Sequence, residues 1–337
     1  MQRKISHVMC QPPFQMNNTS EPRQWQSKVI LYTNREFLIC QILLGCSGNV
    51  LNLVVLLSRN MRSRTNLIFA VMAFADLFFL LMHIPRFLFF CELLHDNDVY
   101  KNSTHLQNGV QNWFSAISIW CMMYATIERV QVFRNPFRTS RRSVSPRFLA
   151  TIALIVIGAL AVTAVHFQSS KASPNQVTRY LLVLHAVSGV FVPLVVLSLL
   201  NVLLVLALKK NTMPVHMLKD SQAQQSLLVA RNKTERKVTI MVTVIISSFI
   251  ICNTPGAILY ILKKPNTDLT TRMLQSISNS LVITGKVLNF VLFCMSSDHF
   301  RALLRMQLVS AFECSSINRR SSCRSATKTF SIPLHDL

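Results

Sequence analysis

The chain has 337 residues, of which 51% are hydrophobic and only 14% are charged, with a mean hydropathy of +0.37. Because soluble domains carry about 25% charged residues, this composition excludes an ordinary water-soluble enzyme. The formal net charge of +22 would suit a nucleic-acid-binding protein, but the basic residues stand in short clusters between long apolar runs rather than on one soluble face. The composition therefore predicts a protein of the lipid bilayer, with no nucleic acid partner.

Seven apolar runs are long enough to cross a bilayer as helices, which takes about 20 residues each. The third run is the most polar, because it includes Ser115, Ser118 and Thr126, and we expect neighbouring helices to shield it from lipid. The sequence therefore predicts an all-α membrane protein, a seven-transmembrane helix bundle. The predicted spans are 38–57, 67–90, 112–133, 148–167, 180–208, 238–262 and 273–296.

The orientation of the bundle is predicted from the Lys and Arg residues in its connections. With the N-terminus outside, the inner segments hold 21 of these residues and the outer segments hold 11. Three Asn-x-Ser/Thr sequons lie in segments placed outside, and a fourth, at Asn232, lies inside. We therefore predict a multi-pass plasma-membrane protein with an extracellular N-terminus and N-glycosylation at Asn17, Asn18 and Asn102.

The spans divide the chain into an extracellular tail at 1–36, the bundle at 37–297, a segment at 298–314 and a tail at 315–337. In 298–314 apolar residues recur at helical spacing between arginines, which is typical of an amphipathic helix on a membrane surface. Cys314 at its end is a candidate for palmitoylation, and the Ser-rich tail after it is predicted to be disordered and cytoplasmic. No phosphate loop, metal-ligand spacing or nucleophile motif occurs in the sequence, so we expect no enzymatic activity, no cofactor and no metal site.

Charged side chains inside a membrane span cost roughly a few kcal/mol each and therefore need an explanation. Four stand out: Asp76 in the second span, Glu128 and Arg129 at the inner end of the third, and Lys286 in the seventh. Arg86 lies near the outer end of the second span. These five residues are the first candidates for functional positions.

Short motifs follow one another along the spans in a fixed order. They are Gly48-Asn49-Val50, Phe74-Ala75-Asp76-Leu77, Glu128-Arg129-Val130, Pro193, Cys252-Asn253-Thr254-Pro255, Asn289-Phe290-Val291-Leu292-Phe293 and Phe300-Arg301. The ordered set resembles the signatures of rhodopsin-like (class A) G-protein-coupled receptors. Three stretches, at 63–68, 118–120 and 288–290, further resemble invertebrate FMRFamide/myosuppressin-type peptide receptors and related nematode chemoreceptor-like receptors.

The chain departs from the family pattern in several motifs. The family's Tyr, Trp, Pro and Tyr are replaced, in that order, by Val130, Asn253, Phe290 and Phe293. The family's disulfide to the second outer loop has neither partner, since Thr104 stands at one Cys position and 168–179 holds no Cys. Cys10 and Cys91 either pair instead or remain free. These departures put conventional activation in doubt but leave the fold prediction unchanged.

The resemblance implies an activation switch at the inner end of the bundle. In the resting state Arg129 would bridge Glu128 and Glu235, and it would meet a heterotrimeric G protein after the sixth helix tilts about Pro255. Asn289 belongs to the same expected switch. The alternative interpretation is an arginine whose charge reaches the membrane interface beside a solvated glutamate.

The resemblance also implies that Asp76 would share a sodium ion with polar neighbours. Lys286, however, lies one helical turn before Asn289 and should face the same cavity. Because an ammonium beside a carboxylate competes directly with a cation, we hypothesise a buried Asp76–Lys286 salt bridge in place of the sodium ion. Alternatively, Lys286 faces a watery vestibule; a retinal Schiff base is disfavoured because the opsin lysine position is held by Ile283.

Helix positions in the family place the ligand pocket in the outer half of the bundle. The expected pocket residues are Arg86, Gln111, His185, Tyr260 and Asn279. Monoamine receptors need an Asp at the position that Gln111 occupies here, so a monoamine ligand is disfavoured. The planar guanidinium of Arg86 suits a carboxylate or a peptide carbonyl. Ordinary packing is an equal alternative for His185 and Tyr260.

The main functional hypothesis is a receptor that couples an extracellular ligand, a short peptide, to a heterotrimeric G protein, with arrestin as a further partner of its Ser-rich tail. One alternative is a seven-helix transporter-like protein that relays ions or protons through Asp76 and Lys286. Another is a receptor-shaped protein that binds a ligand without signalling, because of its divergent motifs.

Overall fold

The computed structural model describes residues 21–58, 63–93, 97–134, 145–167, 176–210, 222–262, 268–296, 300–307 and 309. Within these residues every regular element is helical. The elements in chain order are α2 (Glu21–Asn34), α3 (Glu36–Leu56), α4 (Arg64–Leu81), α5 (Ile84–Phe90), α6 (Asn97–Arg134), α7 (Pro146–Thr163), η2 (Ala164–Phe167), α8 (Gln176–Ala186), η3 (Val187–Phe191), α9 (Val192–Lys210), α10 (Gln222–Leu262) and α11 (Leu269–Ser296).

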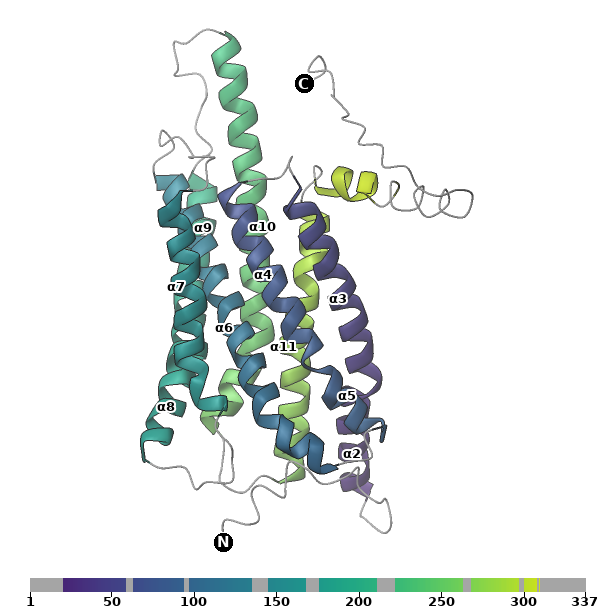
Figure 1. Cartoon of the computed structure of the whole chain (residues 1–337). Coiled ribbons are helices and arrows are strands. Elements are labelled where there is room, and N and C mark those ends of the chain that lie inside the picture. The colour runs from purple at the N-terminus through teal and green to yellow at the C-terminus, as the bar shows by residue number, and fades with distance from the viewer. Residues whose placement is uncertain are drawn as a thin grey trace.

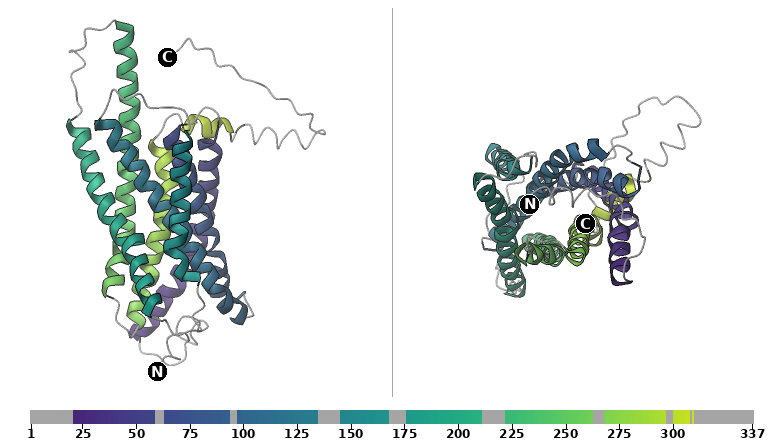
Figure 2. Two further views of the ribbon diagram at one scale, coloured as in Figure 1. Left: turned by 60° about the vertical axis from the view of Figure 1, so that its left-hand side comes forward. Right: turned by 90° about the horizontal axis from the view of Figure 1, so that it is seen from below.

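These elements form seven long helical segments that run side by side (Figure 1). Four of the segments are composite: α2 with α3, α4 with α5, α7 with η2, and α8 with η3 and α9. Seen along the bundle axis, the segments form a ring (Figure 2). We call the two ends of the bundle the Glu21 end, where α2 begins, and the Phe300 end, where a short helix over residues 300–307 lies crosswise (Figure 1).

Five helical stretches are long and apolar enough to cross a membrane, at 23–56, 64–90, 146–167, 183–206 and 239–259. Their outward surfaces carry large apolar side chains, such as Leu154, which is 69% exposed, and Ile251, which is 71% exposed. Exposing so many large apolar side chains to water is unfavourable. The bundle surface therefore suits a lipid environment.

The remaining two long helices, α6 and α11, are more polar, and neighbouring helices cover their polar faces. α6 packs on α4, α7, α9 and α10, and its Ser118 and Thr126 are fully buried. The expectation that the third span is shielded from lipid agrees with this packing.

Local sequence signals explain where several helices begin and break. Ser63 and Ser145 cap the starts of α4 and α7, because their hydroxyls accept the backbone N–H groups of Asn66 and Phe148. α4 gives way to α5 just before Pro85, whose missing N–H and bulky ring cannot continue the preceding helix.

Three helices are longer than the sequence predicts. The first segment begins with α2 at Glu21 rather than near residue 37, α6 begins at Asn97 rather than 112, and α10 begins at Gln222 rather than 238. The added turns are polar, so hydropathy does not reveal them. α2 is nevertheless held in place by packing on α11 and α3.

The helix at 300–307 has two distinct faces. Phe300 and Leu303 are buried in the core of the bundle, whereas Arg301 and Arg305 are exposed. The Gln307 side chain donates to the backbone oxygen of Val54, 3.4 Å away. This pattern is the one expected of an amphipathic helix, and residues 310–337, including Cys314, lie outside the described part of the chain.

Candidate functional site

A pair of opposite charges lies inside the bundle between α4 and α11. The Nζ atom of Lys286 is 2.7 Å from Oδ1 of Asp76. Asn289 donates from Nδ2 to the other carboxylate oxygen over 2.7 Å. The Asp76 side chain is fully buried and that of Lys286 is 6% exposed. The structure thus brings the three residues together, with both carboxylate oxygens engaged from one face of α11.

The helical spacing of α11 explains this arrangement. Lys286 and Asn289 are three residues apart, so their side chains project from the same face of the helix. The ammonium also lies 5.6 Å from the ring centroid of Phe79, one turn after Asp76 on α4. The carboxylate and the aromatic face together stabilise the buried ammonium, while the amide of Asn289 binds the second carboxylate oxygen.

Arg129 lies at the Phe300 end of α6, with 8% of its surface exposed. Its guanidinium donates from Nη2 to the hydroxyl of Thr65, in the first turn of α4. The neighbouring Glu128 lies one turn after Tyr124 on α6. The structure therefore joins Arg129 to α4. Glu235 belongs to α10, but its side chain lies outside the described part of the chain.

Thr65 and Arg64 are partners that the sequence analysis did not identify. Arg64 donates from Nη2 to the hydroxyl of Ser145 over 3.2 Å, and its guanidinium lies 5.8 Å from the ring centroid of Phe148. The start of α4 is thus connected to α6 through Thr65 and to α7 through Arg64. Both residues directly follow the N-cap Ser63. This N-cap in the sequence could have predicted that they lie in the first turn of α4.

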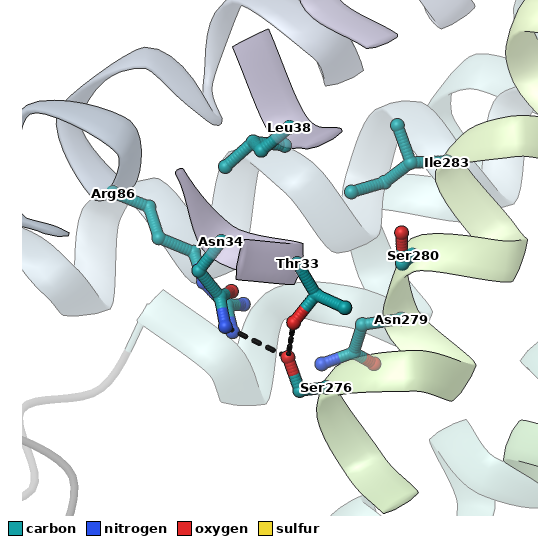
Figure 3. Close-up of a pocket in the computed structure, with 8 residues that line it drawn as sticks. All are labelled: Thr33, Asn34, Leu38, Arg86, Ser276, Asn279, Ser280 and Ile283. Atoms are coloured by element: carbon teal, nitrogen blue, oxygen red, sulfur yellow. Dashed lines mark hydrogen bonds between the residues drawn. The ribbon is translucent and has the colours of Figure 1, made fainter. Parts of the chain in front are cut away.

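A small cavity of about 10 Å³, room for about one water molecule, opens at the Glu21 end, between α2, α3, α5 and α11 (Figure 3). Arg86 and Asn279, which the sequence analysis places in the ligand pocket, both line it. The other lining residues are Thr33, Asn34, Leu38, Ser276, Ser280 and Ile283. The side chains on this wall are amides, hydroxyls, two apolar groups and one guanidinium, and no Asp or Glu is among them.

Hydrogen bonds between α2 and α11 form one side of this cavity. The hydroxyls of Thr33 and Ser276 are 2.6 Å apart, and Asn34 donates from Nδ2 to Ser276 over 2.7 Å (Figure 3). The Ser276 hydroxyl thus forms hydrogen bonds with two residues of α2. These contacts explain why a polar helix that the hydropathy pattern omits is nonetheless ordered against the bundle.

The other expected pocket residues have different surroundings. Gln111 donates from Nε2 to the backbone oxygen of Met82 over 2.8 Å and lies 3.4 Å from Nδ1 of His83. His185 contacts His166, with 2.9 Å between Nδ1 and Nε2. Neither Gln111 nor His185 lines the cavity of Figure 3. Tyr260 belongs to α10, and its side chain is not described.

The predicted modification sites lie mostly beyond the described residues. Asn17, Asn18 and Cys314 are outside them, and Asn102 lies in α6 with an undescribed side chain. Cys91 is a free thiol in the structure, while its possible partner Cys10 is again outside the described part. These assignments remain predictions.

The family model for "7 transmembrane receptor (rhodopsin family)" matches residues 48–297. The chain belongs to this family. The match spans from the Gly48 motif of α3 to the end of α11, and so includes Asp76, Arg129 and Lys286. The receptor is therefore a member of a family of membrane receptors, as its motifs indicate.

Two curated proteins of Caenorhabditis elegans are similar to the receptor in sequence. "Putative G-protein coupled receptor F59B2.13" is 29% identical over 304 residues, covering 79% of the receptor and 71% of the relative. "Probable G-protein coupled receptor B0563.6" is 25% identical over 320 residues, covering 83% and 70%.

The crystal structure of squid rhodopsin has the same fold. It superposes with a TM-score of 0.70, covering 90% of the receptor and 94% of the squid chain, at 15% sequence identity. At this identity the likeness concerns the fold alone. The predicted all-α, seven-transmembrane bundle is confirmed.

Proposed function

We propose that the receptor couples an extracellular ligand, a short peptide, to a heterotrimeric G protein from the plasma membrane. The Glu21 end would face outward, as the distribution of Lys and Arg between the connections predicts. Two relatives carry names that describe G-protein coupled receptors, and their similarity extends over most of the chain. The glycosylation, palmitoylation and arrestin assignments belong to the same proposal.

The observation that carries the proposal is the position of Arg129. Its guanidinium is buried at the Phe300 end and is engaged by Thr65 of α4. At this end of the bundle α10 extends past the other helices (Figure 1). An arginine held inside the bundle can be released to a partner when the neighbouring helices separate. In the proposed mechanism, ligand binding favours a state in which α10 tilts about Pro255, and Arg129 then contacts the G protein.

The charge pair is assigned a structural part in this mechanism. Lys286 supplies a cation on a covalent tether, so Asp76 needs no dissolved sodium ion for its neutralisation. Because Lys286 is engaged by Asp76 and lies three residues after Ile283 of the cavity wall, its placement favours a structural charge pair over a Schiff base with retinal.

The cavity of Figure 3 is too small to enclose a peptide terminus, so the proposed ligand group would meet its wall only after the surrounding helices move apart. That wall includes the Arg86 guanidinium together with amide and hydroxyl groups and no carboxylate. A guanidinium binds a carboxylate through two parallel hydrogen bonds. This chemistry suits the C-terminal carboxyl or amide group of a short peptide.

Guanine-nucleotide exchange on purified G proteins tests the proposal directly. The purified receptor in lipid nanodiscs is expected to accelerate exchange on one G-protein class when challenged with a library of short peptides, and Arg129→Ala is expected to abolish the acceleration. Peptide binding without exchange would support the non-signalling alternative. Proton or ion flux through reconstituted vesicles, lost in Lys286→Met, would instead support the transporter-like alternative.

A further inference from the structure

Two histidines from different helical segments meet near the Glu21 end of the bundle. His166 belongs to η2, at the end of the fourth segment, and His185 lies in the last turn of α8, at the start of the fifth. The Nε2 atom of His166 is 2.9 Å from Nδ1 of His185. The ring centroids are 4.3 Å apart, and the ring planes are inclined by 78°. One nitrogen of each imidazole thus lies within hydrogen-bond distance of the other across a helix–helix contact, with the two rings edge to face.

We propose that His166 and His185 form a two-histidine binding site for a divalent transition-metal ion, Zn²⁺ in particular. Imidazole nitrogens are among the preferred ligands of Zn²⁺, with bonds of about 2.0–2.1 Å, and a tetrahedral ion holds two such nitrogens about 3.3 Å apart. Starting from 2.9 Å, the two nitrogens need to separate by about 0.4 Å, and the rings also need to turn so that both lone pairs converge on the ion.

Proton positions in the pair are compatible with metal binding. In the present contact one ring donates N–H and the other accepts, so one facing nitrogen carries a proton. Metal binding requires a lone pair on both. A tautomeric change supplies it without any net loss of a proton, because the donating ring can carry its hydrogen on its other nitrogen, Nδ1 of His166 or Nε2 of His185.

The backbone next to His185 leaves space for its imidazole ring. His185 is followed by the π-helical segment η3, which includes Gly189. A β-carbon at Gly189 would lie 3.2 Å from Nε2 of His185, closer than an ordinary contact. The absence of a side chain at this position lets the ring lie against η3 and keeps Nδ1 directed at His166.

The number of protein ligands determines how tightly the site can bind Zn²⁺. No Asp, Glu, Cys or third His joins the pair within the described residues. Both rings are only partly buried, so water can complete the tetrahedral shell. We therefore expect micromolar rather than nanomolar binding, with the ion linking η2 to α8. The inference does not depend on the proposed coupling to a G protein.

Zinc-dependent thermal stability of the purified full chain tests the site. At 100 μM Zn²⁺ the apparent Tm should rise by about 3 °C, whereas Mg²⁺ at the same concentration should leave it unchanged. His166→Gln and His185→Gln should each abolish the zinc effect, because glutamine keeps a polar group but removes the imidazole. His105→Gln, on α6, is the matched control and should retain it. Calorimetric titration should give one Zn²⁺ per chain.

Two results would overturn the assignment. A parent chain whose Tm does not respond to Zn²⁺ would show that the pair is a hydrogen bond and nothing more. A zinc effect that survives both glutamine substitutions would place the ion elsewhere. If the variants do not fold, carbethoxylation of the parent chain decides: Zn²⁺ should protect His166 and His185 but not His105, and unchanged labelling at the pair would refute the site.

Discussion

Lys286 places its ammonium 2.7 Å from the carboxylate of Asp76 in the interior of the bundle. The two residues are 210 positions apart in the chain and belong to α4 and α11. Neither charge has appreciable access to solvent. Each therefore depends on the other, and this dependence leads to the first two predictions.

Removing one charge should destabilise the receptor more than removing both. Lys286→Met preserves much of the side-chain volume but leaves Asp76 as an unpaired buried carboxylate, which typically costs about 3–5 kcal/mol. The double variant with Asp76→Asn removes both charges and should recover most of that loss. Thermal unfolding of the two single variants and the double variant measures the coupling. A Lys286→Met receptor as stable as its parent would show that the bridge contributes nothing.

The thermal stability of the parent receptor should not depend on sodium. Because the Lys286 ammonium already neutralises Asp76, exchanging NaCl for choline chloride at constant ionic strength should change the Tm by less than about 1 °C. In Lys286→Ala the space and the unpaired carboxylate become available, and sodium should then stabilise the variant. The comparison is made by thermal unfolding in the two salts. A clear sodium dependence in the parent would contradict the tethered-cation interpretation.

Thr65→Val should raise basal signalling, since it deletes the hydroxyl that accepts from Arg129. Hydrogen bonds to charged groups contribute about 1.5–3 kcal/mol, so a shift of the resting equilibrium by roughly ten- to a hundredfold is expected. Basal nucleotide exchange measures it. Thr126→Val is the control, because the Thr126 hydroxyl is equally buried but donates to Met122 within α6. Equal basal rates in the two variants would rule out the restraint by Thr65.

Gly48→Ala should destabilise the contact between α3 and α11. A β-carbon at this position would lie 2.6 Å from Cγ of Phe290, and overpacking of this kind costs about 1–3 kcal/mol. Gly256→Ala is the matched control, because its β-carbon would meet nothing nearer than Cβ of Ser278 at 3.9 Å. Thermal unfolding should show a lower Tm for the first variant only, and parallel behaviour of both would mean that Phe290 moves aside freely.

Hydropathy and charge distribution predict the seven-helix architecture because lipid imposes the same requirement on every span. The pairing of Asp76 with Lys286 could also be expected, since the three-residue spacing of Lys286 and Asn289 fixes a shared helix face. The spans follow from hydropathy, the resemblance places Asp76 near Asn289, and the helical period then places Lys286 on the same face as Asn289.

Contacts between side chains that are distant in sequence could not be read in the same way. α2 is ordered by Thr33 and Asn34 meeting Ser276 on α11, and these small polar residues give no periodic signal. The expected bridge from Arg129 to Glu128 and Glu235 stays a prediction, and the hydrogen bond from Arg129 to Thr65 on α4 is a contact that no sequence pattern indicated. Gln111 and His185 likewise have partners on neighbouring segments, because local packing decides which way a side chain turns.

The length of α10 has a mechanical consequence. Pro255 lies 33 residues after Gln222, so the helix extends about 50 Å beyond this proline at 1.5 Å per residue. A bend of only 10° at Pro255 would displace the far tip by about 9 Å over that length. If α10 bends at Pro255 as proposed, small changes beside this proline, near one end of the bundle, would be magnified into large displacements of the start of the helix at the opposite end.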